Sequence, residues 1–224
     1  MRRSRANRAQ STRSSGAVNQ APSRQMCNPY APMELMDESQ LDDIHQASLK
    51  LLCKVGMDFQ SPRAVDILRR AGAMIDADGL RVRFDPDWLM QTIATTPKSF
   101  VLHGRRPDRH LTMGGNSTAF AMVASTPNVS DLDRGRVAGN YDDFCNLLRL
   151  GESLNSVQLQ AGFPVEPCDV PVNTRHLVAG AAMARLTTKP IGGYALGRQR
   201  MQDVIDIVRI ARGIDHATLL QQPC

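Results

Sequence analysis

Cysteine, histidine and glycine are the residues whose types and spacing could support nucleophilic, metal or phosphate chemistry in this sequence. The cysteines are widely scattered and form no CxxC pair, so they lack the spacing of a zinc site. Such a set indicates reduced thiols in a cytoplasmic protein. Cys53 and Cys145 lie on apolar helical faces, as buried structural thiols do, while a catalytic cysteine stays open. The five cysteines are Cys27, Cys53, Cys145, Cys168 and Cys224.

Two histidines and a glycine pair are also weak signals of a site. His103 and His110 stand at the two ends of the segment HGRRPDRH and have no companion ligand at metal-binding spacing. Gly114 and Gly115 would need a longer glycine pattern and a helix directly after them to cradle a phosphate, and the sequence has neither. We therefore predict a turn at the glycines and no metal site.

Three predicted strands, each followed by a predicted helix, would position any site in the second half of the chain. Residues 118–125 (TAFAMVAS) form a nearly continuous apolar run, which predicts a strand buried on both faces. Residues 155–162 and 189–196 predict two further strands. A turn at Asp133-Arg134-Gly135 and an N-cap at Asn140 precede the first helix. The three helices are predicted over residues 141–154, 171–188 and 197–213.

Regular alternation of strand and helix predicts βαβ units on a parallel sheet. An open dinucleotide-binding sheet should carry a GxGxxG turn after its first strand, where this chain has ASTPNVSD. A closed (β/α)8 TIM barrel takes about 250 residues, whereas 107 residues follow from Thr118 onward. We therefore predict an α/β fold with a partial (β/α)8 barrel of three βα units, truncated before a fourth strand that residues 213–224 would approach. The chain would then be the N-terminal part of a longer enzyme.

An α-rich region with short β-hairpins precedes the predicted barrel. A helix is predicted over residues 39–56, with Ser39 as N-cap and Gly56 at its end. Further helices are expected from Pro62 to Gly72 and from Asp85 to Pro97, with a strand over 80–84 between them. Residues 99–104 and 109–113 should form a hairpin. The expected organisation is a disordered basic tail over 1–27, an α-rich region over 28–116 and the barrel part over 117–224.

The positive charge of the chain belongs to its tail. The net charge is +5, but residues 1–25 contain six arginines and no acid, which leaves 21 basic against 22 acidic residues elsewhere. The tail has no hydrophobic periodicity, so we predict that it is disordered. An export signal would need an apolar stretch of about 7–15 residues after the arginines, and none follows. A solvated arm is favoured, a transit peptide stays open, and no apolar run is long enough for a membrane span.

Four segments, taken together, resemble the N-terminal half of the trimethylamine methyltransferase family, especially bacterial members acting on glycine betaine-like quaternary amines. They are CNPYAPMELMDESQLDDIHQASLKLLCKVGMDF, LHGRRPDRHLTMGG, SDLDRGRVAGNYDDF and CDVPVNTRH, and the likeness runs collinearly from about Asn28 to Leu220. The resemblance implies a β/α barrel that demethylates a methylated amine and passes the methyl group to cobalamin, a corrinoid, on a partner protein. No cofactor would be bound directly by this chain. Family members that use trimethylamine carry pyrrolysine in the C-terminal half, which this sequence does not include.

The resemblance also suggests where a substrate would bind. A quaternary ammonium has no N–H to donate, so its recognition depends on aromatic faces and carboxylates. Barrel sites lie at the carboxyl ends of the strands, here STPN, GFPVE and GYAL. We therefore expect Phe163, Tyr194 and Glu166 to bind the cation and Asn128 to orient the substrate, although a Phe or Tyr at a strand end more often closes the barrel core. Asp131 and Asp133 are expected to be turn residues, and no residue is assigned a catalytic role.

The sequence thus predicts a corrinoid-dependent amine or betaine methyltransferase whose N-terminal fragment would be inactive alone. One alternative is a fragment of another β/α-barrel enzyme, and the other is an inactive truncated product whose basic tail contacts nucleic acid. The expected partners are a corrinoid protein and a small methylated amine, with no membrane. Nucleic acid is not the favoured partner, and a homo-oligomer stays open.

Overall fold

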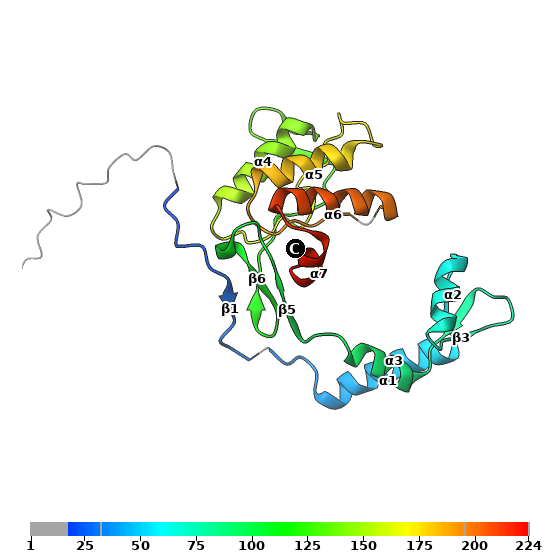
Figure 1. The fold of residues 1–224 in the computed structure, drawn as a ribbon. Helices are drawn as coiled ribbons and strands as arrows, with labels where there is room; N and C mark the ends of the chain where they lie inside the picture. Colours follow the sequence, from blue (N-terminus) through cyan, green and yellow to red (C-terminus); the bar gives the residue numbers. More distant parts are fainter. Residues whose placement is uncertain (1–17, 32, 195, 224) are drawn as a thin grey trace, which may run out of the picture. The chain divides into compact units, whose positions relative to one another are not determined.

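The computed structural model describes residues 18–31, 33–194 and 196–223. The predictions for residues 1–17, most of the basic tail, lie outside the described residues. Contacts between Cα atoms divide the chain into two units. The smaller unit is Asn28–Phe100, and the larger combines the residues up to Cys27 with Val101–Cys224. Figure 1 shows the elements that make up each unit.

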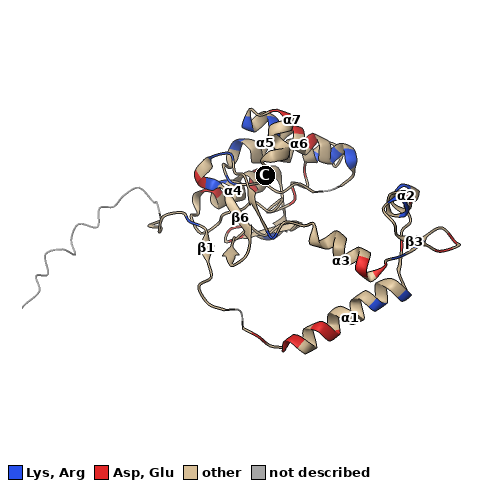
Figure 2. Cartoon of the chain, turned by 60° about the horizontal axis from the view of Figure 1, so that its bottom comes forward, with Lys and Arg blue, Asp and Glu red and all other residues tan. Residues whose placement is uncertain are grey.

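The smaller unit packs three helices with a three-stranded antiparallel sheet. The sheet order is β2-β4-β3, with β4 in the centre. Its core contains Val82 and Phe84, and the Trp88 ring stacks on Phe84 with 6.1 Å between ring centroids. Figure 2 shows acidic residues near the start of α1 and basic residues towards its end, which suits the helix dipole. The elements are α1 (Glu38–Lys54), β2 (Met57–Asp58), α2 (Pro62–Arg70), β3 (Met74–Ile75), β4 (Arg81–Arg83) and α3 (Pro86–Ala94).

The predicted helices of this unit are confirmed, with one correction at an N-cap. Asp37, rather than Ser39, caps α1: its carboxylate accepts the Gln40 N–H, and the Gln40 side chain accepts the Asp37 N–H. The Ser39 hydroxyl instead donates to Asp37 Oδ1 at 2.7 Å. Ser61 and Asp85 cap α2 and α3. The helices begin where short polar side chains can bind the first free N–H groups.

Three extended segments run parallel to one another in the larger unit. Isolated bridges join Ala121 to Leu159 and Gln160 to Ile191. The expected parallel order is therefore present, but regular strands over 118–125, 155–162 and 189–196 are not formed, and that part of the prediction is wrong. Pro190 has no N–H to give to a ladder, and glycines 162, 192 and 193 weaken strand pairing.

Three helices pack side by side in the larger unit, with α5 between α4 and α6 (Figure 1). Asn140 caps α4 as predicted, and Gly213 ends α6 in the left-handed region. The second helix begins at Arg175 rather than Pro171, because the Pro171 carbonyl closes a turn with the N–H groups of Thr174 and Arg175. Helix α7, with Asp215 as N-cap, occupies the predicted approach to a fourth strand. The helices are α4 (Tyr141–Ser153), α5 (Arg175–Leu186), α6 (Arg198–Arg212) and α7 (His216–Gln221).

The helices cover one face of the extended segments and leave the other face in solvent. Gln160 is fully buried, and a Cβ atom at Gly151 of α4 would touch its side chain. Alternate residues on the opposite face, such as Ala121 and Ala161, are exposed. The prediction that residues 118–125 are buried on both faces is wrong, since Val123 is 63% exposed. The described residues form a mixed α/β fold without a closed barrel.

Hairpins and an N-terminal arm complete the larger unit. The predicted hairpin is present as β5 with β6, and β8 with β9 forms a second antiparallel hairpin. The arm, residues 18–27, is held by hydrogen bonds from Gln20 to Ser153 and from Gln25 to Thr112, and it lines a hollow of about 450 Å³. No helix in the described part of the chain could cross a membrane. Strand β7 pairs with β1. The elements are β1 (Met26–Cys27), β5 (Ser99–Leu102), the 3-10 helix η2 (Pro107–Arg109), β6 (Leu111–Gly114), β7 (Ser117–Thr118), β8 (Asn128–Asp131) and β9 (Gly135–Ala138).

Candidate functional site

Three residues from three different extended segments meet at the carboxyl ends of those segments. The Tyr194 hydroxyl lies 2.7 Å from Ser125 Oγ and accepts the Phe163 N–H at 3.0 Å. The Ser125 N–H donates to the Phe163 carbonyl at 2.9 Å. The rings of Phe163 and Tyr194 meet edge to face, with centroids 4.8 Å apart. Because parallel segments bring their carboxyl ends together, this group lies where β/α proteins place their sites.

The backbone around this group lets the Tyr194 side chain approach the second extended segment closely. Gly162 has φ +148°, and a Cβ atom there would lie 2.7 Å from Tyr194 Oη. Ser125 has φ +65° and is the one non-glycine residue at positive φ among the described residues. Phe163 is 6% exposed and also meets Phe144 of α4 edge to face at 5.4 Å. The aromatic pair is therefore an extension of the core, with Tyr194 at its half-buried end.

The other two predicted site residues have separate surroundings. Glu166 accepts a hydrogen bond from Arg175 Nη1 at 3.4 Å, and the same guanidinium donates to the Val170 carbonyl. Asn128 pairs with Ala138 in the β8–β9 hairpin. The structure thus brings Phe163 and Tyr194 into contact. The Glu166 N–H donates to the Thr126 carbonyl, next to Ser125, but the Glu166 carboxylate is paired with Arg175, and Asn128 lies in the hairpin. Our sequence reasoning missed Ser125, whose one signal was its place directly after the first apolar run.

Charged pairs fix the loops and helices of the larger unit. The Arg134 guanidinium contacts both carboxylate oxygens of the buried Asp143 and also Asp131. The Asp143 carboxylate, followed by Asp131, raises the pKa of Arg134. The Asp131 carboxylate also accepts the N–H groups of Asp133 and Arg134, which confirms the turn predicted there. Arg134 therefore ties the β8–β9 hairpin to α4.

Helices α5 and α6 share a second charged contact. His176 Nε2 lies 2.8 Å from Asp203 Oδ2, and Gln199 donates to the other carboxylate oxygen. The hydrogen bond from His176 and then that from Gln199 lower the pKa of Asp203. This contact joins two helices of the outer layer.

The amino end of the third extended segment is a polar, packed region. Lys189 is 2% exposed, and its ammonium donates to the carbonyls of Gly151 and Leu154 at the end of α4. Burial lowers the pKa of Lys189 to about 8. Burial acts to raise the pKa of Glu152, but hydrogen bonds from Thr188 and Thr187 outweigh it and keep this pKa below its usual value. This network connects α4 to the chain after α5.

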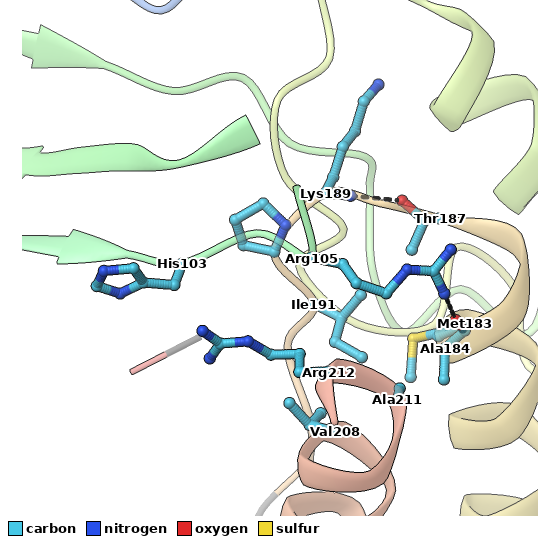
Figure 3. Close-up of a pocket in the computed structure, with 11 residues that line it drawn as sticks. His103, Arg105, Met183, Ala184, Thr187, Lys189, Ile191, Val208, Ala211 and Arg212 are labelled. Carbon is cyan, nitrogen blue, oxygen red and sulfur yellow. Dashed lines mark hydrogen bonds between the residues drawn. The ribbon is translucent and has the colours of Figure 1, made fainter. Parts of the chain in front are cut away.

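Figure 3 shows a cavity beside this network. Its volume is about 30 Å³, enough for about one water molecule and too small for a trimethylated amine. The Lys189 side chain extends away from those of Arg105 and Arg212 in this view, and Arg105 donates to the Ala184 carbonyl. The cavity is thus a packing void at the end of the segments remote from Tyr194. It is lined by His103, Arg105, Met183, Ala184, Thr187, Lys189, Pro190, Ile191, Val208, Ala211 and Arg212.

Metal ligands are not clustered in the described ranges. Nowhere in residues 18–31, 33–194 and 196–223 do three or more His, Cys, Asp or Glu side chains group so that they could hold a metal ion. The rings of His103 and His110 pack edge to face at 4.7 Å. Burial, and then the neighbouring His103, lower the pKa of His110.

Parallel extended segments, each followed by a helix, with an aromatic pair at their carboxyl ends define the class of a mixed α/β protein. The chain belongs to the trimethylamine methyltransferase (MTTB) family, whose model matches residues 1–224. The resemblance predicted from the sequence is therefore confirmed, and the family is one of methyltransferases.

Curated relatives match most of this chain. A glycine betaine methyltransferase of Desulfitobacterium hafniense (strain Y51) is 27% identical over 179 residues, which cover 80% of this chain and 37% of the relative. A proline betaine:corrinoid methyltransferase of Eubacterium limosum is 36% identical over 193 residues, 81% of this chain and 39% of the relative. The trimethylamine methyltransferase MttB of D. hafniense (strain DSM 10664 / DCB-2) is 30% identical over 135 residues, 59% and 27% respectively. The chain spans less than two fifths of the length of these relatives.

Proposed function

We propose that this chain is part of a methyltransferase that moves a methyl group from a methylated or quaternary amine to a corrinoid carried by a partner protein. The family match over the whole chain is the observation that carries this proposal. Two relatives from Eubacterium limosum, the proline betaine:corrinoid methyltransferase and an L-carnitine:corrinoid methyltransferase, are named for a corrinoid acceptor. The proposal includes a cytoplasmic location and a corrinoid protein as partner.

The fold proposed for the active protein is a (β/α)8 barrel to which this chain contributes the first βα units. Three observations support it: the parallel order of the extended segments, the helices on one face, and the apolar side chains exposed on the other. Val123, which alternates with Ala121 on that face, would be buried by further βα units. The greater length of the relatives supports the same view. In this organisation residues 1–27 are a tail, 28–116 an α-rich region and 117–224 the barrel part.

The substrate would bind at the carboxyl ends of the extended segments. The half-buried ring of Tyr194 would meet the cation, with the buried Phe163 ring packed against it. An ammonium within about 6 Å of a ring centroid is attracted to the ring face. Glu166 would add negative charge if its weak 3.4 Å contact with Arg175 opened. Asn128 would orient the substrate from the β8–β9 hairpin.

The chemistry requires little covalent work from the chain itself. The positively charged nitrogen of a quaternary amine leaves readily, because the C–N bonding pair stays on nitrogen as the methyl group departs. A reduced corrinoid on the partner protein would supply the electron pair for the new bond to the methyl carbon. The residues of the chain would hold the cation, align the methyl group and exclude water.

The test measures cobalt methylation by visible absorbance with the protein, a reduced corrinoid protein and a panel of glycine betaine, proline betaine, L-carnitine and trimethylamine. We expect methyl transfer from at least one amine when the chain is extended at its C-terminus to the full length of its relatives. We expect no methyl transfer from the 224-residue chain alone. Replacement of Tyr194 by Leu should raise the KM for the amine. Absence of cobalt methylation with every amine of the panel would reject the proposal.

A further inference from the structure

Helix α1 exposes an apolar stripe along its length. The members of the stripe are spaced alternately three and four residues apart, which is the spacing of the a and d positions of a coiled coil. Its four apolar side chains are each more than half exposed. The contacts of α1 with α3 and β4 lie on a different side of the helix, where Leu52 packs against the core of the smaller unit. The stripe consists of Leu41, Ile44, Ser48, Leu51 and the C-cap residue Val55.

The stripe is symmetric about Ser48. If two copies of α1 crossed in opposite directions at this residue, Leu41 of each copy would lie against Val55 of the other. Ile44 would lie against Leu51 in the same way. The Ser48 hydroxyl donates to the Ile44 carbonyl at 2.9 Å, so its one donor is already used within the helix. A small side chain with a satisfied hydroxyl therefore stands where the two backbones would come closest.

The charges of α1 favour an antiparallel pair over a parallel one. Acidic side chains, among them Asp42 and Asp43, lie in the first half of the helix, and Lys50 and Lys54 lie in the second half (Figure 2). In an antiparallel pair centred on Ser48, Asp43 is level with Lys54 of the second copy to within one residue, an offset of about 1.5 Å along the axis. A parallel pair would bring like charges together. Antiparallel helices also set the two ends of their dipoles against each other favourably.

We propose that this chain associates with a second copy of itself through an antiparallel pair of α1 helices. The occupant is a second copy because the same stripe supplies a match for each of its own apolar positions and charges. Self-complementarity of this kind is what a two-fold interface between identical chains requires. Pairing removes the exposed apolar side chains of both copies from water. The surface belongs to the smaller unit and takes no part in the methyl transfer proposed above.

Sedimentation velocity of the 224-residue chain over a wide range of protein concentration tests this inference. We expect a dimer that dissociates on dilution. Ile44→Glu places a charge in the stripe of both copies and should raise the dissociation constant at least about a hundredfold, because each of the two substitutions costs about tenfold or more. Gln46→Glu, two residues away on the opposite side of α1, is the matched control and should leave the dissociation constant unchanged. Both positions are exposed, so both variants should fold, which circular dichroism checks.

Exchange of charges tests the direction of the two helices. Asp43→Lys and Lys54→Glu each bring like charges together in an antiparallel pair, so each variant alone should associate about fivefold more weakly. An equimolar mixture of the two variants restores opposite charges at both contacts and should associate as tightly as the unsubstituted chain.

Three results would overturn the inference. The first is a monomer at every concentration, which would assign the stripe to another segment or another protein. The second is a dimer that Ile44→Glu leaves intact, and the third is a mixture of the charge variants that associates no more tightly than either variant alone. The proposed function stands in all three cases, because cobalt methylation is measured separately.

Discussion

Lys189 makes the stability of the larger unit depend on pH in a way that can be calculated. Burial lowers the pKa of this lysine from 10.5 to about 8 in the folded chain. Between these values the unfolded chain holds a proton that the folded chain has lost, so the free energy of unfolding rises with pH. Neutral lysine keeps two N–H donors, which suffice for the carbonyls of Gly151 and Leu154.

The size of the effect follows from the two pKa values. One pKa unit corresponds to about 1.4 kcal/mol, so the shift predicts a gain of about 2 kcal/mol in the free energy of unfolding between pH 7 and pH 9.5. Lys189→Met removes the titrating group, and the variant should lack this gain. Other groups that titrate in the same range are common to both proteins and cancel in the comparison.

Urea unfolding at the two pH values measures the difference. Circular dichroism at 222 nm follows the helices of both units. Fluorescence of Trp88, the single tryptophan, identifies the transition of the smaller unit because this ring stacks on Phe84. That transition should respond equally to pH in the two proteins. Equal pH dependence of the remaining transition in Lys189→Met and the unsubstituted chain would refute a buried lysine whose pKa is lowered by burial.

Two further predictions concern packing and a charged contact. Leu148 is fully buried, so Leu148→Ala should lower the free energy of unfolding by about 2–5 kcal/mol. Leu150 lies on the same helix and is 49% exposed, so Leu150→Ala should lower the free energy of unfolding by less than about 1 kcal/mol in the same urea titration. Equal losses of unfolding free energy in the two variants would contradict the burial of Leu148. The pKa of Asp203, measured by NMR, should lie below 3.8 and rise in His176→Ala, with Gln202→Ala as a control one residue away. Any stability from this pair is present above the unfolded-state pKa of the carboxyl and is lost as the pH falls through the folded-state value. A pKa that stays in place in His176→Ala would contradict the hydrogen bond.

Local side-chain chemistry made most helix positions predictable from the sequence. Asn140, Ser61 and Asp85 each place an oxygen where it can bind the first free N–H groups of a helix, and the helices begin there. Asp37 and Ser39 are both competent caps, so sequence alone could not choose between them. The start of α5 was predicted too early, because proline at 171 also suits the turn that the structure has.

Contacts between distant parts of the chain decided the rest. The alternation of apolar runs and helices predicted that the carboxyl ends of the segments would lie together. The contact between Phe163 and Tyr194, which are 31 residues apart in the sequence, agrees with this prediction. The positive φ of Ser125 could not be predicted, because it depends on hydrogen bonds to Phe163 and Tyr194 rather than on neighbours in sequence. Burial of residues 118–125 on both faces was predicted from composition alone. Composition shows that a side chain is apolar, but only the presence of a second packed layer can remove that side chain from water.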